Sequence, residues 1–117
     1  ILYEHVTELI TTETMRERKQ IMEDRADAFI MTPGGIGTLE EFFEILTLKQ
    51  LGRHGKAIVV YNQNGFFEPL LTMMQETACK GFMTDATNKI YTVMDDADAI
   101  IDYLENYKTD IGRVFKF

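Results

Sequence analysis

The sequence lacks the features that mark secreted and membrane-spanning proteins. It contains a single cysteine, Cys79, so no intramolecular disulfide can form, which fits a reducing compartment such as the cytoplasm. No apolar run approaches the roughly 20 residues that cross a bilayer, and no signal-peptide pattern is present. We therefore expect a cytoplasmic protein that does not associate with membranes.

Positive charge is also scarce. The net charge is −7 and no basic cluster occurs, which argues against nucleic-acid binding as the main role. The overall acidity does not exclude a phosphorylated ligand, because local dipoles and one or two cations decide such binding. The length of 117 residues, with 45% hydrophobic and 26% charged residues, predicts one globular domain over 1–117 that ends in a tail over 109–117.

Short apolar runs alternate with segments of helical periodicity along the chain. The pattern predicts strands over 29–31, 57–61 and 89–93, a weaker strand over 6–11, and helices over 14–24, 38–51, 69–81 and from Asp95 onward. Gly52 is expected to end the second helix and Asp95 to cap the last one. This alternation predicts an α/β fold, a Rossmann-like parallel sheet flanked by helices. No element is predicted for the tail.

The stretch from Ala28 to Glu41 is the most informative part of the chain. It reads as a strand, a turn with three glycines, and the start of a helix. That geometry directs backbone N–H groups and the positive end of a helix dipole at one point, which suits a phosphate. Glycines fit there because they accept positive φ angles and carry no Cβ that would block a ligand. The alternative is a plain strand-to-helix connection with Thr38 as N-cap. The turn matches neither the dinucleotide fingerprint nor the P-loop.

The helix over 14–24 carries charge on its apolar side. Met15, Ile21 and Met22 form a stripe at helical spacing, and Arg18 and Arg25 fall on that stripe. The opposite face holds Arg16, Glu17, Gln20, Glu23 and Asp24. Since an unpaired buried charge is costly, the two inward arginines either extend along the apolar surface, pair with carboxylates, or serve a site. For Arg25 we favour a structural role.

Two motifs together resemble a known family. Pro-Gly-Gly-Ile-Gly-Thr-Leu-Glu-Glu over 33–41 and Met-Arg-Glu-Arg-Lys over 15–19 are similar to the LOG family, the cytokinin riboside 5′-monophosphate phosphoribohydrolases, often labelled lysine decarboxylase-like. The resemblance covers about 7–107 and corresponds to the C-terminal part of the family's domain. The family's first strands, a further glycine loop and an acidic site residue have no counterpart here. We interpret the chain as a fragment, and whether it is active by itself stays open.

The resemblance implies hydrolysis of the N-glycosidic bond in a nucleoside 5′-monophosphate, without cofactor or metal. It implies Arg18 and Glu41 as catalytic residues. The substrate-binding residues that it implies are Arg18, Lys19, Gly34, Gly35, Ile36, Gly37, Thr38, Glu40 and Glu41. Glycosyl cleavage passes through an oxocarbenium-like state, so a carboxylate beside the anomeric carbon is needed, and Glu41 is the candidate. Taken without the resemblance, Thr38 and Glu41 also fit a capping box.

Several alternatives stay open. The preferred base, cytokinin or adenine, cannot be read, and a non-catalytic nucleotide or cofactor-phosphate binder is the rival function. Lysine decarboxylation is disfavoured, because no lysine stands in a context for a pyridoxal phosphate Schiff base. The helix over 38–51 is apolar nearly all round, which with the family's oligomeric character predicts a homodimer contacting through Ile45, Leu48 or Leu51. His54 is interpreted as a solvated loop residue.

Overall fold

The computed structural model describes residues 15–107 and 114–117, and only the backbone at positions 15, 16, 18, 114 and 115. The weak strand predicted over 6–11 lies outside these residues. The elements are α1 (Met15–Arg25), β1 (Ala28–Met31), α2 (Ile36–Gln50), β2 (Ala57–Tyr61), α3 (Glu68–Cys79), β3 (Thr92–Met94), α4 (Ala97–Tyr107) and β4 (Val114–Lys116), with short 3-10 turns at Gln63–Gly65 and Asp85–Lys89.

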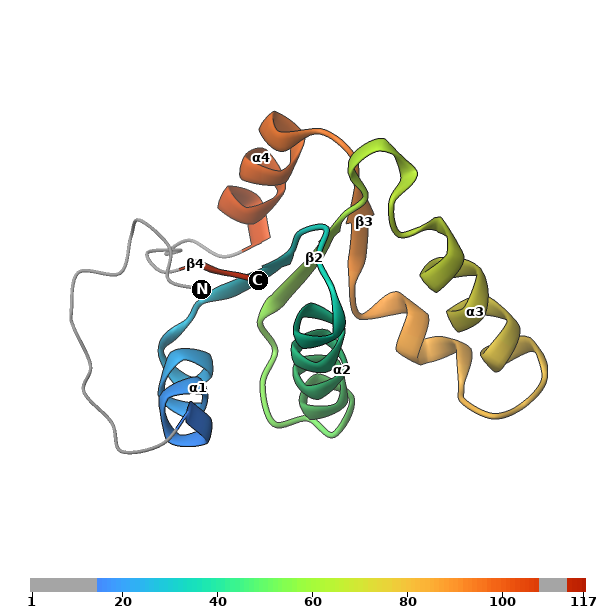
Figure 1. Ribbon diagram of the computed structural model, residues 1–117, viewed down its shortest axis with the longest axis horizontal. Coiled ribbons are helices and arrows are strands. Elements are labelled where there is room, and N and C mark those ends of the chain that lie inside the picture. Colours follow the sequence, from blue (N-terminus) through green and yellow to red (C-terminus); the bar gives the residue numbers. More distant parts are fainter. Residues whose placement is uncertain (1–14, 108–113) are drawn as a thin grey trace.

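The described strands form one parallel sheet in the order β3-β2-β1-β4 (Figure 1). In the register, Phe29 of β1 lies opposite Ile58 of β2 and Phe115 of β4. Strands β1 and β2 are almost entirely buried, as expected for a parallel sheet covered on both faces. The predicted α/β, Rossmann-like architecture is therefore confirmed.

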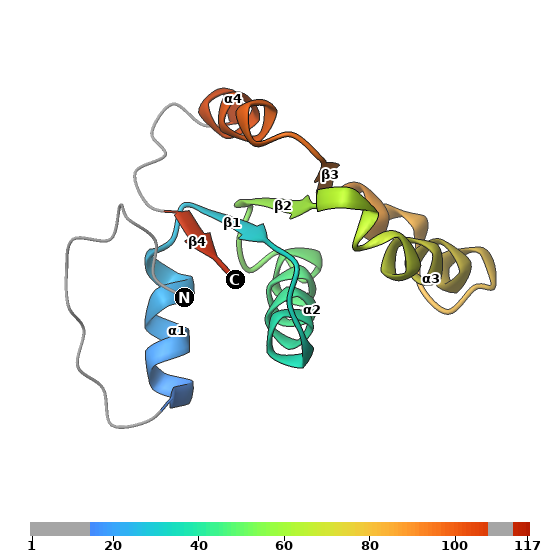
Figure 2. The ribbon, with the colours of Figure 1, turned by 45° about the horizontal axis from the view of Figure 1, so that its top comes forward.

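Helices cover the two faces of the sheet unequally. Figures 1 and 2 show α1 and α2 on one side of the sheet, α4 on the other, and α3 beyond β3. The larger core joins alternate residues of β1 and β2 to α2 and α3, and consists of Ala26, Phe29, Met31, Phe42, Ile45, Leu46, Ile58, Val60, Phe67, Met74 and Phe117. The smaller core, under α4, consists of Ala28, Ile30, Ala57, Val59, Ile100 and Leu104. This alternation along both strands follows from their period of two.

Among the residues that the structure describes, no helix has both the length and the apolar character that crossing a bilayer requires.

Helix α2 begins earlier than predicted, which corrects the expected N-cap. The first helical residue is Ile36, and the N-cap is Gly35, with no side chain bonded to the helix start. The Leu39 N–H donates to the Gly35 carbonyl at 3.2 Å, so Thr38 already lies inside the first turn. Thr38 is therefore not an N-cap, and the capping-box interpretation of Thr38 and Glu41 is wrong.

Other boundaries were predicted with mixed success. Gly52 follows the last turn of α2 with a φ of 77°, which confirms it as the residue that ends the helix. The cap of α4 is Asp96, whose Oδ2 accepts the Ala99 N–H at 2.8 Å, so the prediction of Asp95 is wrong by one position. The strand predicted over 89–93 is displaced to Thr92–Met94, because a 3-10 turn occupies Asp85–Lys89.

The apolar residues on several sides of α2 are covered largely by the same chain. Ile45 is fully buried in the larger core, so the prediction that it contacts a second subunit is wrong. Leu48 is half-buried, and Leu51 is exposed at the end of the helix. The ring of Phe42 meets Tyr91, which precedes β3, edge to face at 5.6 Å between centroids. Helix α2 is thus buried on more than one side by its own chain.

The end of the chain forms an element that the sequence did not predict. Strand β4 pairs with β1, and the N–H of Phe117 donates to the Ile30 carbonyl at 3.0 Å. The Phe117 carbonyl in turn accepts the N–H and the hydroxyl of Thr32 at 2.6 and 2.8 Å. The Phe117 side chain is 5% exposed and belongs to the larger core. This segment therefore adds a strand to the sheet beside β1.

We predict that Phe117→Ala lowers the free energy of unfolding by about 3–5 kcal/mol, the usual cost of truncating a core phenylalanine. Phe82→Ala is the matched control, because Phe82 is 82% exposed, and it should cost less than about 0.5 kcal/mol. Urea denaturation of both variants measures the difference. Equal midpoints would show that Phe117 does not hold β4 in the core.

Candidate functional site

The glycine turn connects the carboxyl end of β1 to the start of α2. In open parallel sheets, ligands bind outside the carboxyl ends of the strands, and the turn occupies that place. Residues Gly34, Gly35, Ile36 and Gly37 are exposed, and no side chain caps the helix. The first N–H groups of α2, at Ile36, Gly37 and Thr38, have no carbonyl of the preceding turn to bond, as at any helix start. The turn is therefore open to an anion.

One of the two reasons predicted for the glycines, a positive φ angle, is wrong. None of the glycines in this turn has a positive φ; those with a positive φ are Gly52, Gly65 and Gly81. A Cβ on Gly34 would overlap the Thr38 hydroxyl, so glycine there allows the first helical turn to fold against the loop. A Cβ at Gly35 or Gly37 would meet no protein atom within 4 Å. Those two positions leave the space in front of the helix empty.

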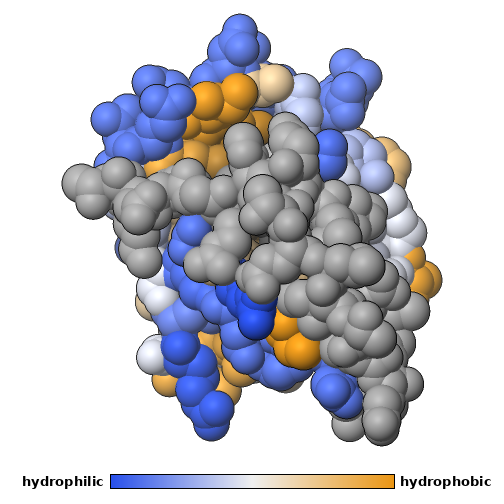
Figure 3. Space-filling model, turned by 90° about the vertical axis from the view of Figure 1, so that its left-hand side faces the viewer, coloured by the Kyte–Doolittle hydropathy of each residue, from blue (hydrophilic) through white to orange (hydrophobic). Residues whose placement is uncertain are grey.

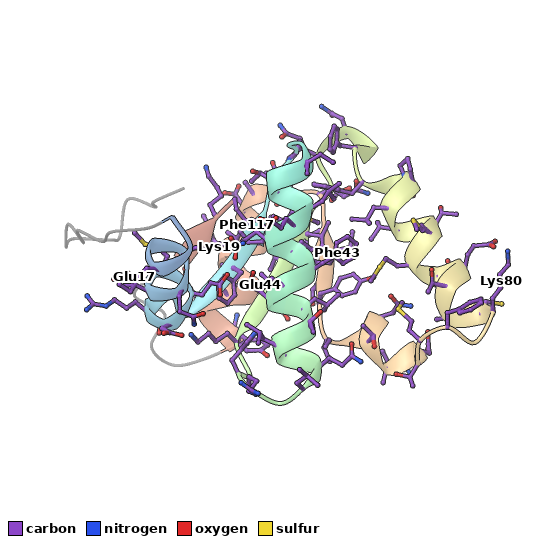
Figure 4. All side chains as sticks on the ribbon, turned by 60° about the horizontal axis from the view of Figure 1, so that its bottom comes forward. Glu17, Lys19, Phe43, Glu44, Lys80 and Phe117 are labelled. Carbon is purple, nitrogen blue, oxygen red and sulfur yellow. The ribbon has the colours of Figure 1, made fainter. Side chains whose placement is uncertain are left out.

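The ammonium group of Lys19 joins α1 to the carboxylates of α2. Its Nζ lies 3.2 Å from Glu40 Oε1, 3.2 Å from Glu44 Oε1 and 3.7 Å from Glu41 Oε1. Figure 4 shows Lys19 and Glu44 facing each other between the helices, with Glu17 on the outer side of α1. Although partial burial disfavours the ammonium, the hydrogen bonds to Glu40 and Glu44 and the nearby Glu41 raise the pKa of Lys19. The lysine is therefore positively charged at any physiological pH.

The predicted catalytic carboxylate is buried. Glu41 is 6% exposed, whereas the side chain of the neighbouring Glu40 is largely exposed. One oxygen of Glu41 lies near Lys19, and the other, Oε2, is buried without a hydrogen-bond partner. No capping role remains for Glu41, and a buried carboxylate with one oxygen left without a donor is costly, which makes Glu41 a candidate for a chemical role.

A residue that the helical pattern assigned to the solvent face belongs to this cluster. Glu23 is 4% exposed, and neither of its oxygens has a hydrogen-bond partner among the described residues. Burial, followed by the nearby Glu41 and Glu44 carboxyl groups, raises the pKa of Glu23 far above its usual value. The sequence signal for this position is its spacing of four from Lys19, which places both side chains on the same face of α1.

The three carboxyl groups of Glu23, Glu41 and Glu44 also have the spacing of a cation site, since one oxygen of each lies within 4.8 Å of the others. Oxygen-rich clusters of this kind suit hard divalent cations. The ammonium of Lys19 already lies at two of these carboxylates, which leaves less negative charge for a metal ion.

The arginines of α1 are only partly accounted for. The side chain of Arg18 lies outside the described residues, so its position in the site stays a prediction. Arg25 is exposed, which agrees with its interpretation as a structural residue whose charge reaches the surface. Figure 3 views the molecule from the left-hand side of Figure 1, where α1 lies, and the described surface there is mostly hydrophilic with separate apolar areas.

His54 is a structural residue instead of a solvated one. Its Nε2 lies 2.9 Å from the Ile45 carbonyl, and its Nδ1 accepts the Lys56 N–H at 3.1 Å. Burial is the main cause that lowers the pKa of His54, which keeps the ring neutral with the proton on Nε2. The ring ties the end of α2 to the loop before β2, far in the chain from the glycine turn, and takes no part in the site.

Fold and site together define a Rossmann-like α/β protein with an uncapped glycine turn and a buried glutamate beside it. A family model described as "Possible lysine decarboxylase" matches residues 1–104. The chain therefore belongs to the LOG family, as its two motifs indicated.

Curated relatives carry more specific names. A cytokinin riboside 5′-monophosphate phosphoribohydrolase of Rhodococcoides fascians is 44% identical over 82% of this chain and 48% of its own length. One of Mycobacterium marinum is 46% identical over 78% of this chain and 49% of its own length, and LOG2 of Arabidopsis thaliana is 39% identical over 89% and 49%. The chain spans about half the length of the curated relatives it matches.

We predict that Lys19→Gln lowers the free energy of unfolding by about 1–3 kcal/mol, since it leaves several carboxylates without their charged donor. The matched control is Lys89→Gln, which removes an exposed bridge to Asp85 at 3.7 Å and should cost less than about 0.5 kcal/mol. Urea denaturation at pH 7 compares the two. Similar small losses would show that Lys19 does not hold α1 against α2.

Proposed function

We propose that the protein hydrolyses the N-glycosidic bond of a nucleoside 5′-monophosphate, giving a free base and ribose 5-phosphate. The observation that carries this proposal is the buried Glu41, on a helix whose start is an open glycine turn without a side-chain cap. The relatives of this chain are named as phosphoribohydrolases acting on such nucleotides. The reaction needs an anion site for the phosphate and a carboxylate for the sugar, and both stand within one helix.

The phosphate is assigned to the start of α2. Its N–H groups at Ile36, Gly37 and Thr38 point out of the helix end, and the partial positive charge of the helix dipole favours an anion there. The Thr38 hydroxyl, beside Gly34, supplies a further donor. Gly35 and Gly37 leave the approach free of side-chain atoms. Together with Gly34, these residues form the proposed phosphate-binding part of the site.

The sugar is assigned to the side of α2 that faces α1. Glu41 follows Gly35 by six positions, an axial rise of about 9 Å, which leaves room for a ribose between the phosphate and the carboxylate. Glu41 stabilises positive charge on the anomeric carbon or activates the attacking water. Glu40 is assigned to the ribose, while Lys19 and Arg18 orient the substrate and offset charge on the departing base.

We predict that Glu41→Gln lowers kcat by about a hundredfold or more, because one preorganised charge beside the oxocarbenium-like state is lost. KM should change little, since the ground-state sugar carries no charge. The free energy of unfolding should change by less than about 1 kcal/mol, because Lys19 keeps Glu40 and Glu44 as partners. Base release and urea denaturation measure both properties in the full-length protein.

The neighbouring substitution Glu40→Gln is the control for this variant. Its exposed carboxylate should affect KM more than kcat if it contacts the ribose. Equal losses of kcat in the two variants would contradict a special role for Glu41.

We further predict that Gly37→Ala weakens binding of a nucleoside 5′-monophosphate at least about tenfold, while binding of the nucleoside is unchanged. The new methyl group meets no protein atom, so the fold should be unaffected or more stable by up to about 0.5–1 kcal/mol. Gly55→Ala, which also enters empty space but in the loop before β2, is the control and should leave both affinities intact. Calorimetry with AMP and adenosine distinguishes the cases. An equal loss for both ligands would mean that the turn does not contact the phosphate.

The rival function is a non-catalytic binder of nucleotide or cofactor phosphates. Such a protein needs the glycine turn but has no use for a buried carboxylate beside the sugar. Incubation of the full-length protein with AMP and with isopentenyladenosine monophosphate decides between the two functions and shows which base is preferred. Release of free base supports the hydrolase, and tight binding without release supports the binder.

We propose that the 117 residues are part of one cytoplasmic domain, that the reaction uses neither cofactor nor metal, and that the protein is a homodimer. For the dimer, exposed Leu51 and half-buried Leu48 at the end of α2 are the residues that a second subunit would cover.

A further inference from the structure

Two carboxyl groups face each other in the buried space between α1 and α2. Both oxygens of Glu23 and the Oε2 atom of Glu41 are buried, and none of them accepts a hydrogen bond from a donor in the described part of the chain. Glu23 is 4% exposed and Glu41 is 6% exposed, so water does not replace the missing hydrogen-bond donors. Glu23 nevertheless lies within hydrogen-bonding reach of Glu41 and Glu44.

The charged groups around Glu23 are unevenly balanced. Helix α1 contributes Lys19, one turn earlier, while Asp24 and Arg25 are exposed, with Asp24 bonded to Gln20. Helix α2 contributes the carboxyl groups of Glu40, Glu41 and Glu44.

The lysines on the neighbouring loop and strand do not restore the balance. The loop before β2 contributes Lys56, whose ammonium donates to the main-chain carbonyls of Glu23 and Asp24 at 2.9 and 3.2 Å. On β4, Lys116 lies in register with Ile30, which belongs to the core on the α4 side of the sheet. Among the described side chains, the ammonium of Lys19 therefore lies near three carboxyl groups of α2, and Glu23 adds a fourth carboxyl group to the cluster.

A proton shared by two of the carboxyl groups resolves this imbalance. Two carboxylates cannot bond to each other, and burying both as anions is costly in repulsion and in lost hydration. One proton shared between them removes a charge and gives each orphaned oxygen a partner, as in other closely paired carboxyl groups. Glu23 is the group to carry it, because Glu41 and Glu44 lie near Lys19, whereas Glu23 has no donor of its own.

We propose that Glu23 is held as a neutral carboxylic acid at physiological pH and donates its O–H to the Glu41 carboxylate. The pair then carries one proton and one negative charge, and the charge stays on Glu41, because a hydrogen bond to the charged form favours that form. Glu23 is thereby a positioning residue: it fixes the orientation of Glu41 without touching substrate. Only this last consequence rests on the function proposed above, since the protonation itself is a property of the fold.

The stability of the protein tests the protonation directly. Unfolded Glu23 ionises at about pH 4.5, whereas folded Glu23 keeps its proton to higher pH, so folding takes up one proton in between. Stability from this group is complete below pH 4.5 and declines as the pH rises. Between pH 5 and 8 the folding equilibrium constant of the wild type should therefore fall about tenfold per pH unit relative to that of Glu23→Gln, which cannot ionise.

The control is Glu105→Gln, an exposed carboxylate on α4, whose pH dependence should parallel that of the wild type. Parallel curves for the wild type and Glu23→Gln would overturn the proposal. Stabilisation of the wild type by millimolar Mg²⁺ or Ca²⁺ that Glu23→Gln abolishes would also overturn it, because a cation would then occupy the place of the proton.

Infrared spectroscopy gives a second readout that a purely structural role would not produce. At pH 7 the wild type should show the carbonyl band of a protonated carboxylic acid, and this band should be absent from Glu23→Gln. A band of equal intensity in both proteins would contradict the assignment to Glu23.

Activity then tests the positioning role. Glu23→Gln keeps an N–H donor toward Glu41, so its kcat should remain within about threefold of the wild type, while Glu23→Ala should lose roughly tenfold in kcat with KM unchanged. Equal kcat values for the Ala and Gln variants would overturn the positioning role. If the protein releases no base from any nucleoside monophosphate, the proposed function fails, yet the stability and infrared results still decide the protonation. If base is released and the stability curves are parallel, this inference alone fails.

Discussion

Hydrogen bonding of β1 along both of its edges is the constraint on which the rest of the structure depends. β2 holds one edge of the strand and β4 the other, and its side chains are buried alternately under α2 and under α4. A strand so enclosed has one direction and one register. Its carboxyl end therefore delivers the glycine turn to a fixed place, and α2 starts there without a side-chain cap. The last residue, Phe117, secures the same strand by bonding to Ile30 and Thr32.

The same constraint explains the concentration of charge between α1 and α2. Helix α1 leads directly into β1, and α2 leads directly out of it, so the two helices lie side by side on one face of the sheet. Acidic residues of both helices then share a narrow, largely buried space with Lys19. In such surroundings electrostatic interactions are stronger than in water, so the state of each carboxyl group depends on its neighbours. Burial of Glu41 and Glu23 is thus a consequence of chain connectivity and of packing, and it gives the site its chemical character.

Much of the fold could be predicted, because the relevant signals are local. Apolar runs marked β1 and β2, Gly52 marked the end of α2 through its positive φ, and the alternation of strands and helices indicated a parallel sheet. The errors fell where two local signals competed. Thr38 resembled an N-cap, but the helix had already begun at Ile36, and Asp95 and Asp96 were equally suitable as caps. Strand β4 carried no clear pattern, since three residues bonded to a single neighbour need little intrinsic preference.

The sequence by itself determined the family, the α/β class and the glycine turn with its nearby glutamates, because motif spacing and hydrophobic period are properties of neighbouring residues. Tertiary structure alone decided which charged groups meet. A helical period divides α1 into one apolar and one polar face, and on that basis Glu23 belongs in solvent. In the folded chain a second helix lies against the polar face, and the same residue is buried against Glu41, which is 18 positions away in sequence. Contacts between elements depend on how the sheet brings them together, and the residue pattern of either helix alone does not show that Glu23 and Glu41 meet.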